Sequence, residues 1–163
     1  MKSKSKSKSK LNLKLNYKRV VIFLVLLWIA FIFARSLKPA NQSQMESMWI
    51  LELFYRLFPF RPSHYFIRKL AHFTEYAILG SFSVPLLKIY FPKRPGFMAL
   101  LLSAPLGVLT ALFDETIQLF VDGRNGEIRD IWLDILGCVT GSLICVILSA
   151  VLRKLKNIKN IKK

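Results

Sequence analysis

VVIFLVLLWIAFIFA, residues 20–34, is an uninterrupted apolar run that decides the class of protein to which this chain belongs. The run fits a membrane-spanning helix if the charged head of Arg35, directly after it, extends to the membrane interface. The whole chain of 163 residues is 53% apolar with a mean hydropathy of +0.40, which is high for a soluble domain. The sequence therefore predicts an integral membrane protein.

A cleaved signal peptide is the alternative interpretation of this first apolar run, because a basic segment precedes the run. No clear pair of small residues marks a cleavage site before the polar stretch that follows. We therefore expect the run to be an uncleaved membrane anchor.

The 25 lysines and arginines give a formal net charge of +16, and they lie mainly in the two tails and beside the apolar runs. This distribution is typical of a polytopic membrane protein and argues against a nucleic-acid partner. We expect a disordered basic cytoplasmic tail at residues 1–19, a membrane domain at 20–152 and a second basic cytoplasmic tail at 153–163.

Three further apolar segments, at about residues 68–88, 96–120 and 135–152, predict three more membrane spans. Between the first two spans, Ser43-x-x-Glu46 resembles a capping box that starts an aromatic helix too short to cross a bilayer. The predicted fold is an all-α polytopic membrane protein with four transmembrane helices and a short interfacial amphipathic helix in the first outer loop.

The positive-inside rule orients these four spans. If both termini lie in the cytoplasm, the two basic tails and the basic segment 88–94 lie on the cytoplasmic side of the membrane. The end of the first span, the start of the second, the end of the third and the start of the fourth then share the outer leaflet.

The stretch RKLAHFTEY, residues 68–76, places ionisable side chains where the second span begins. Residues three and four apart are neighbours on a helix, and an ionisable group in an apolar segment is costly enough to suggest a function. Similar residues end the third span and start the fourth. The candidate polar site therefore consists of Lys69, His72, Glu75, Tyr76, Asp114, Glu115, Gln118, Arg124, Asp130 and Asp134.

Each acid of this set also has a structural interpretation. Access to water is enough to account for an acid beside a helix end, and Asp130 lies where a carboxylate complements the helix dipole. Several carboxylates in one thin layer repel one another unless cations pair with them, so we expect a mixed, partly protonated network. The cations available to this network are Arg35, Lys69, Arg124, Arg129 and His72.

Small residues recur in the fourth span, and the spacing of Gly137 and Gly141 allows close helix packing or a homo-oligomer. Cys138 and Cys145 are about 10 Å apart on a continuous helix, too far for a disulfide. No serine or cysteine nucleophile is identifiable, and Ser36 is the one hydroxyl near the polar layer that merits attention, although helix capping explains it as well.

Three motifs together resemble the VanZ-like family. They are Lys69-x-x-His72-Phe73-x-Glu75-Tyr76 on the second span, Asp114-Glu115-x-x-Gln118-x-Phe120 with Arg124 on the third, and Asp130-x-x-x-Asp134-x-x-Gly137-x-x-x-Gly141 on the fourth. The resemblance implies a small polytopic bacterial membrane protein, in a family named after a member associated with teicoplanin resistance. The family pattern usually has asparagine at position 134, where this chain has a potential charge.

Several functions are compatible with these residues. The first is binding or modification of an envelope component, for instance a lipid-linked cell-wall precursor or an amphiphilic antibiotic. In an enzymatic version, Glu75 or Asp114 would be the general base and His72 its proton partner. Arg124 would hold an anionic group. The second is a structural or partner subunit whose polar network stabilises the bundle.

Two further classes have weaker support. His72 and the acids offer ligand types for a divalent ion, but without a paired-histidine motif we expect no metal or cofactor. A transporter is weaker still, because the chain shows no internal repeat.

Overall fold

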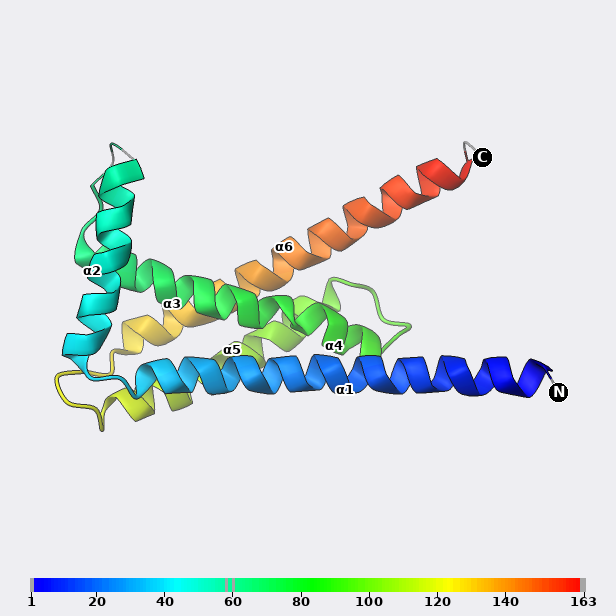
Figure 1. Ribbon diagram of the computed structural model, residues 1–163, viewed down its shortest axis with the longest axis horizontal. Coiled ribbons are helices and arrows are strands. Elements are labelled where there is room, and N and C mark those ends of the chain that lie inside the picture. Colours follow the sequence, from blue (N-terminus) through cyan, green and yellow to red (C-terminus); the bar gives the residue numbers. More distant parts are fainter. Residues whose placement is uncertain (1, 58, 60, 162–163) are drawn as a thin grey trace.

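The computed structural model describes residues 2–57, 59 and 61–161, and every element in these ranges is a helix (Figure 1). The predicted all-α fold is confirmed. In chain order the helices are α1 (Lys2–Ser36), α2 (Ala40–Leu57), α3 (His64–Ser81), α4 (Ser83–Tyr90), α5 (Met98–Gln118) and α6 (Ile128–Ile161).

Three of the described helices contain a segment long and apolar enough to cross a membrane. The segments are Leu13–Ser36 in α1, Met98–Gln118 in α5 and Ile128–Asn160 in α6. Large apolar side chains cover their outward faces, and Trp132, for example, is 70% exposed. Such exposure suits contact with lipid, so the helices are those of a membrane protein.

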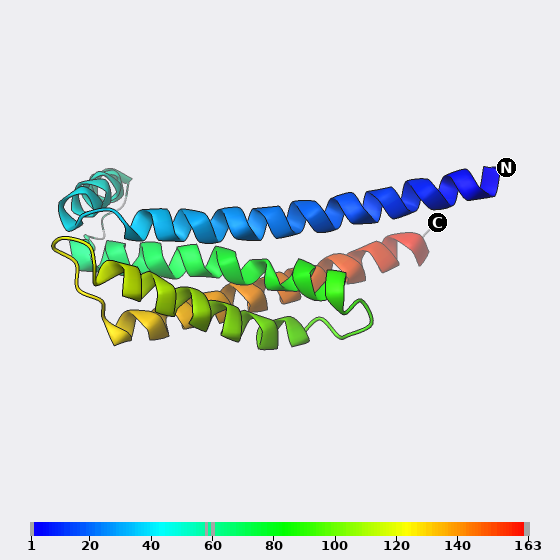
Figure 2. The same ribbon diagram turned by 90° about the horizontal axis from the view of Figure 1, so that it is seen from below.

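The second predicted span, residues 68–88, differs from the prediction because it is divided between α3 and α4. α3 ends at Ser81, and α4 begins at Ser83 and continues in roughly the same direction (Figures 1 and 2). Pro85 has no backbone N–H to donate to the carbonyl of Ser81, which interrupts the helix at this point. The structure thus has three single helices of spanning length where the sequence predicted four.

α1 is longer than the predicted first span. It begins at Lys2 and includes most of the segment 1–19, for which the sequence predicted no regular structure. Lysine and leucine are good helix formers, and extending an existing helix requires no new nucleation. α6 likewise continues through most of the basic segment 153–163.

α2 runs across the bundle at the end of α1 and the start of α3 (Figure 1), and it starts earlier than the sequence predicted. The backbone N–H of Ser43 donates to the carbonyl of Pro39, so Ser43 lies inside the helix and does not cap it. The capping-box interpretation was therefore wrong. The side chain of Glu46 forms ion pairs with Arg35 and Lys38 instead.

α3 and α6 cross in direct backbone contact. A Cβ atom added to Gly141 would lie 1.7 Å from the carbonyl oxygen of Ala77, and one added to Gly80 would lie 1.7 Å from that of Cys138. A Cβ on Gly137 would lie 2.5 Å from the carbonyl oxygen of Phe73. The glycine face of α6 is therefore covered by α3 of the same chain.

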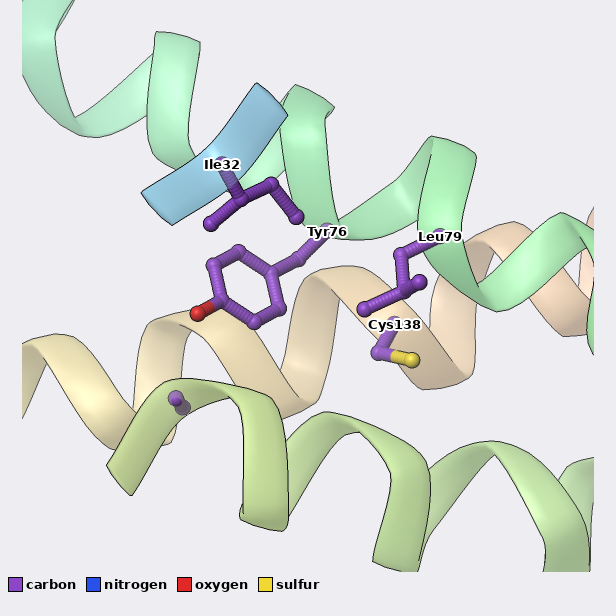
Figure 3. Close-up of a cluster of buried hydrophobic side chains, with 5 residues drawn as sticks. Ile32, Tyr76, Leu79 and Cys138 are labelled. Atoms are coloured by element: carbon purple, nitrogen blue, oxygen red, sulfur yellow. The ribbon is translucent and has the colours of Figure 1, made fainter. Parts of the chain in front are cut away.

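An apolar cluster beside this crossing joins four helices (Figure 3). The ring of Tyr76 lies between the helices, with its hydroxyl directed away from Leu79 and Cys138. This arrangement buries the ring and leaves the polar tip on the side away from the apolar cluster. The cluster consists of Ile32, Tyr76, Leu79, Ala111 and Cys138.

Candidate functional site

α2 and the α5–α6 connection lie at one end of the bundle, opposite the two chain termini (Figures 1 and 2). Buried polar side chains gather at this end. We call this region the polar end. It joins the end of α1, the first half of α3, the end of α5 and the start of α6. Its buried polar residues include Ser36, Asp114, Glu115, Gln118, Asp130 and Asp134.

The register of α3 at the polar end is set by a helix cap. The side chain of Ser63 accepts a hydrogen bond of 3.2 Å from the backbone N–H of Phe66, which satisfies a donor that the first helical turn cannot. From this start, the three- and four-residue spacing carries Lys69, His72 and Glu75 to neighbouring positions on α3.

Asp114 is fully buried near the end of α5 and receives hydrogen bonds from two elements. The hydroxyl of Ser36, on α1, donates to its Oδ1, and Gln118 Nε2 donates to its Oδ2 over 3.4 Å. The Tyr76 hydroxyl is close to the same carboxylate without meeting hydrogen-bond geometry. Ser36 and Gln118 thus fix the orientation of the Asp114 carboxylate.

His72 and Asp134 complete the centre of the polar end. His72 Nδ1 lies 4.0 Å from Asp114 Oδ2 and 4.0 Å from Asp134 Oδ1. Asp134 is 0% exposed, and within the described ranges neither of its carboxylate oxygens has a hydrogen-bond partner, nor does His72 Nδ1. Buried polar atoms are rarely left without partners, so this centre requires an explanation.

Arg35 connects α1, α2 and α3. Its Nε lies 2.6 Å from Glu75 Oε1 and its Nη1 lies 3.1 Å from Glu46 Oε2. Glu46 also accepts a hydrogen bond from Lys38, and this bond is the main reason that the pKa of Glu46 falls below its usual value. Trp28 Nε1 adds a 2.9 Å hydrogen bond to the carbonyl of Glu75.

Lys69 and the acids around the start of α6 form the opposite side of the polar end. Lys69 pairs closely with Asp130, and its Nζ lies 3.7 Å from Glu127 Oε2. Glu115 accepts a 2.8 Å hydrogen bond from the backbone N–H of Glu127 and a 3.3 Å bond from Gln118. These contacts join α3, α5 and α6.

Arg124 lies in the turn between α5 and α6, where Gly123 adopts a φ of +73° that favours glycine. Its Nη2 lies 3.4 Å from the carbonyl oxygen of Arg35, to which it donates a hydrogen bond. Burial lowers the pKa of Arg124 from its usual value, although a guanidinium stays protonated near neutral pH. Within the described ranges, the bond to Arg35 is the one hydrogen bond of the Arg124 side chain, which has five N–H donors.

Three neighbouring spaces border these side chains. A polar cavity of about 160 Å³ lies between α3 and the α5–α6 turn. A small polar pocket shares Arg68, His72 and Arg124 with this cavity, and it shares Arg35 and Glu75 with an apolar groove of about 350 Å³. The groove lies between α1, α2 and α3.

The structure brings all ten predicted site residues to the polar end, with Asp114 and Asp134 at its centre and Lys69 and Asp130 at its edge. Arg129, which the sequence offered as a partner for the acids, is exposed, and no ion pair to it forms in the described part of the chain. Sequence reasoning missed the role of Arg68 in lining both polar spaces, although Arg68 is part of the stretch that drew attention to α3.

One group of side chains has the composition of a metal-binding set. His72, Asp114 and Asp134 each offer a ligand atom, and these three atoms lie within 4.8 Å of one another. They come from α3, α5 and α6, so only the tertiary fold brings them together. No local spacing in the sequence signals this set.

The sequence profile of the VanZ/LLP1 family matches residues 21–149. No curated protein and no solved structure shows significant similarity to the chain. The matched range runs from the apolar part of α1 into the second half of α6 and includes the whole polar end. Because the match covers most of the sequence, the chain belongs to the VanZ/LLP1 family.

Proposed function

We propose that this VanZ-like membrane protein binds or modifies an amphiphilic, anionic component of the bacterial cell envelope at its polar end, and thereby contributes to resistance against glycopeptides of the teicoplanin type. The observation that carries the proposal is the proximity of the apolar groove to the polar cavity, since a small pocket shares wall residues with both of them. A site of this kind suits a ligand with a lipid tail and a polar head.

The apolar groove offers a surface for the tail. Trp28 and Phe31 of α1, Ile50 and Phe54 of α2 and Leu70 of α3 line it. A groove of about 350 Å³ falls within the usual range of ligand sites. Its aliphatic and aromatic walls match an acyl or polyprenyl chain.

The polar cavity offers donors for the head group. Arg68 and Arg124 line both the cavity and the small pocket next to the groove. Guanidinium groups bind phosphate and carboxylate oxygens in a bidentate manner. A lipid-linked cell-wall precursor or an acidic lipoglycopeptide carries such groups next to an apolar chain.

The proposed orientation places the polar end at the outer face of the bacterial cell membrane and both termini in the cytoplasm. Basic residues at the opposite end of the bundle support it by the positive-inside rule. α3 and α4 would together form the second of the four spans that the sequence predicts, at residues 68–88. The basic residues that support the orientation include Lys18, Lys88, Lys93, Arg94 and Arg153.

A susceptibility panel tests this function. Cells expressing the wild type, Arg124→Gln or Arg129→Gln are challenged with glycopeptides and lipopeptides, and membrane abundance of the protein is measured in parallel. We expect Arg124→Gln to remove the resistance at equal abundance, because a hydrogen bond to a charged group contributes about 1.5–3 kcal/mol, or about tenfold or more in affinity. Arg129→Gln is the matched control, since Arg129 is exposed in the same region.

Resistance that survives Arg124→Gln at normal abundance would contradict the proposed head-group site. A panel in which the wild type protects against none of the compounds would contradict the resistance role itself.

A structural role is the second candidate, and the ion pairs between helices favour it. Arg35–Glu75 joins α1 to α3, and Lys69–Asp130 joins α3 to α6. If the network only stabilises the bundle, Glu75→Gln lowers the amount of folded protein and leaves resistance per molecule unchanged. If Glu75 acts in the site, resistance per molecule falls.

A further inference from the structure

We propose that His72, Asp114 and Asp134 bind a divalent transition-metal ion, for which Zn²⁺ is the best match. The three side chains converge from α3, α5 and α6, and their ligand atoms lie within 4.8 Å of one another. One imidazole nitrogen and two carboxylates are a donor set that Zn²⁺ accepts. Three protein ligands leave a coordination position open for water or another oxygen ligand.

The distances fit a shared ion better than hydrogen bonds. His72 Nδ1 lies 4.0 Å from one oxygen of each carboxylate, whereas a direct hydrogen bond between such groups spans about 2.7–2.9 Å. Two ligands of one tetrahedral Zn²⁺, each about 2.1 Å from the metal, are about 3.4 Å apart. Small side-chain rotations are enough to close the remaining difference.

The charge balance at this centre also points to a cation. Asp134 is fully buried, and among the described residues both of its oxygens lack a hydrogen-bond partner. Two of the nearby cations are engaged elsewhere, Arg35 with Glu75 and Lys69 with Asp130. A divalent ion would neutralise two carboxylates at a depth where unpaired charge is expensive.

Two hydrogen bonds hold the carboxylate of Asp114 in place. Ser36 donates to Oδ1, and Gln118 donates over 3.4 Å to Oδ2, the oxygen that lies 4.0 Å from His72 Nδ1. Such outer partners orient a metal ligand and raise the affinity of the site.

The centre borders the polar cavity. His72 belongs both to the proposed ligand set and to the wall of the polar cavity of about 160 Å³. We therefore expect an ion to enter from the cavity, past His72, next to the space where the proposed head group binds. The metal proposal concerns the same site but does not depend on the resistance role, because bound metal is measured directly.

The test uses full-length protein, purified in detergent with an affinity tag that contains no histidine and stripped with a chelator. Bound metal per chain is measured by mass spectrometry after incubation with Zn²⁺, Mn²⁺ or Mg²⁺ and desalting, and the affinity by titration calorimetry. We expect about one Zn²⁺ per chain, weaker binding of Mn²⁺ and none of Mg²⁺, because an imidazole ligand disfavours Mg²⁺.

Two matched pairs of variants locate the ion. Asp134→Asn and His72→Gln should weaken Zn²⁺ binding by more than about 100-fold, since loss of an outer partner alone costs about 10–100-fold. Asp122→Asn and His64→Gln make the same chemical changes outside the ligand set, and we expect both to keep wild-type affinity. Ser36→Ala should weaken binding by about 10–100-fold.

The wild type alone can overturn the proposal, even if a variant fails to fold. If the stripped and reloaded wild type binds no stoichiometric Zn²⁺, the metal proposal is wrong. A proton shared between His72 and the aspartates would then explain the atoms without hydrogen-bond partners. Equal binding in wild type and in folded Asp134→Asn would assign the metal to another site. Bound Zn²⁺ without any resistance phenotype would contradict the proposed function and leave the metal site standing.

Discussion

α3 is held against α6 in two places that work in different ways. At the crossing, Gly80, Gly137 and Gly141 bring the two backbones into contact without any side chain between them. At the polar end the same helices are separated by charged side chains, with Lys69 paired to Asp130 and His72 4.0 Å from Asp134. The crossing leaves no space for a side chain. Among the described residues, the polar end contains buried atoms of His72 and Asp134 without a hydrogen-bond partner.

This difference separates the parts that maintain the fold from the parts that are free to act. Backbone contact contributes packing and has no chemistry to offer a ligand. Buried ionisable groups stabilise a membrane bundle poorly unless they are paired, so their presence indicates a function. We therefore expect substitutions at the crossing to affect folding and those at the centre of the polar end to affect ligand or metal binding.

The largest effect is expected from Gly141→Ala. The new Cβ would lie 1.7 Å from the carbonyl oxygen of Ala77, and since the obstacle is backbone, the two helices must move apart. We expect a loss of about 3 kcal/mol in the free energy of unfolding, measured by thermal denaturation in detergent. Gly96→Ala is the control, because its Cβ would come no closer than 3.8 Å to a neighbour. Equal stability of the two variants would disprove the close crossing.

A smaller effect is expected when the Arg35–Glu75 pair is broken. Removing one partner of a fully buried ion pair costs about 3–5 kcal/mol. The side chains of Arg35 and Glu75 are 29% and 13% exposed, so we expect about 2 kcal/mol for Arg35→Gln. The double variant Arg35→Gln/Glu75→Gln should recover part of this loss, because it leaves no unpaired charge at position 75. Strictly additive losses would mean that the two side chains do not interact in the membrane protein.

The comparison also shows how far sequence patterns can predict such a molecule. Apolar runs predicted α5 closely and the apolar part of α6, because the length of the apolar part of a membrane helix is set by the bilayer. The same apolar runs predicted one helix where the structure has α3 and α4, because a proline near the end of an apolar run does not reveal whether the helix bends or stops. The apolar pattern also did not predict that α1 extends into the basic segment, because the helix there is an extension of the apolar helix that follows it.

The polar end could be predicted as a layer but not as a set of contacts. Topology placed Glu75, Asp114 and Asp134 at similar depth, and the structure brings them to one end of the bundle. Which acid pairs with which cation depends on side-chain direction and on turns such as the one after Lys38. That turn brings Glu46 to Arg35, whereas the local spacing suggested a helix cap.

The smallest effect concerns Glu46, at the outer edge of the polar end. The hydrogen bond from Lys38 is the main cause that lowers its pKa below the ordinary value of 4.5, with Arg35 adding to it. A lowered pKa in the folded state stabilises the protein above pH 4.5, and this contribution is lost as the pH falls through the folded-state pKa. The side chain is 38% exposed and screened by solvent, so we expect less than about 1 kcal/mol.

Melting temperatures of wild type and Glu46→Gln should differ near neutral pH and converge in acid. Glu52→Gln, an exposed acid on the same helix whose ion pair is 3.9 Å long, is the control. A difference between wild type and Glu46→Gln that persists in acid would mean that packing of α2, and not the charge of Glu46, links it to α1.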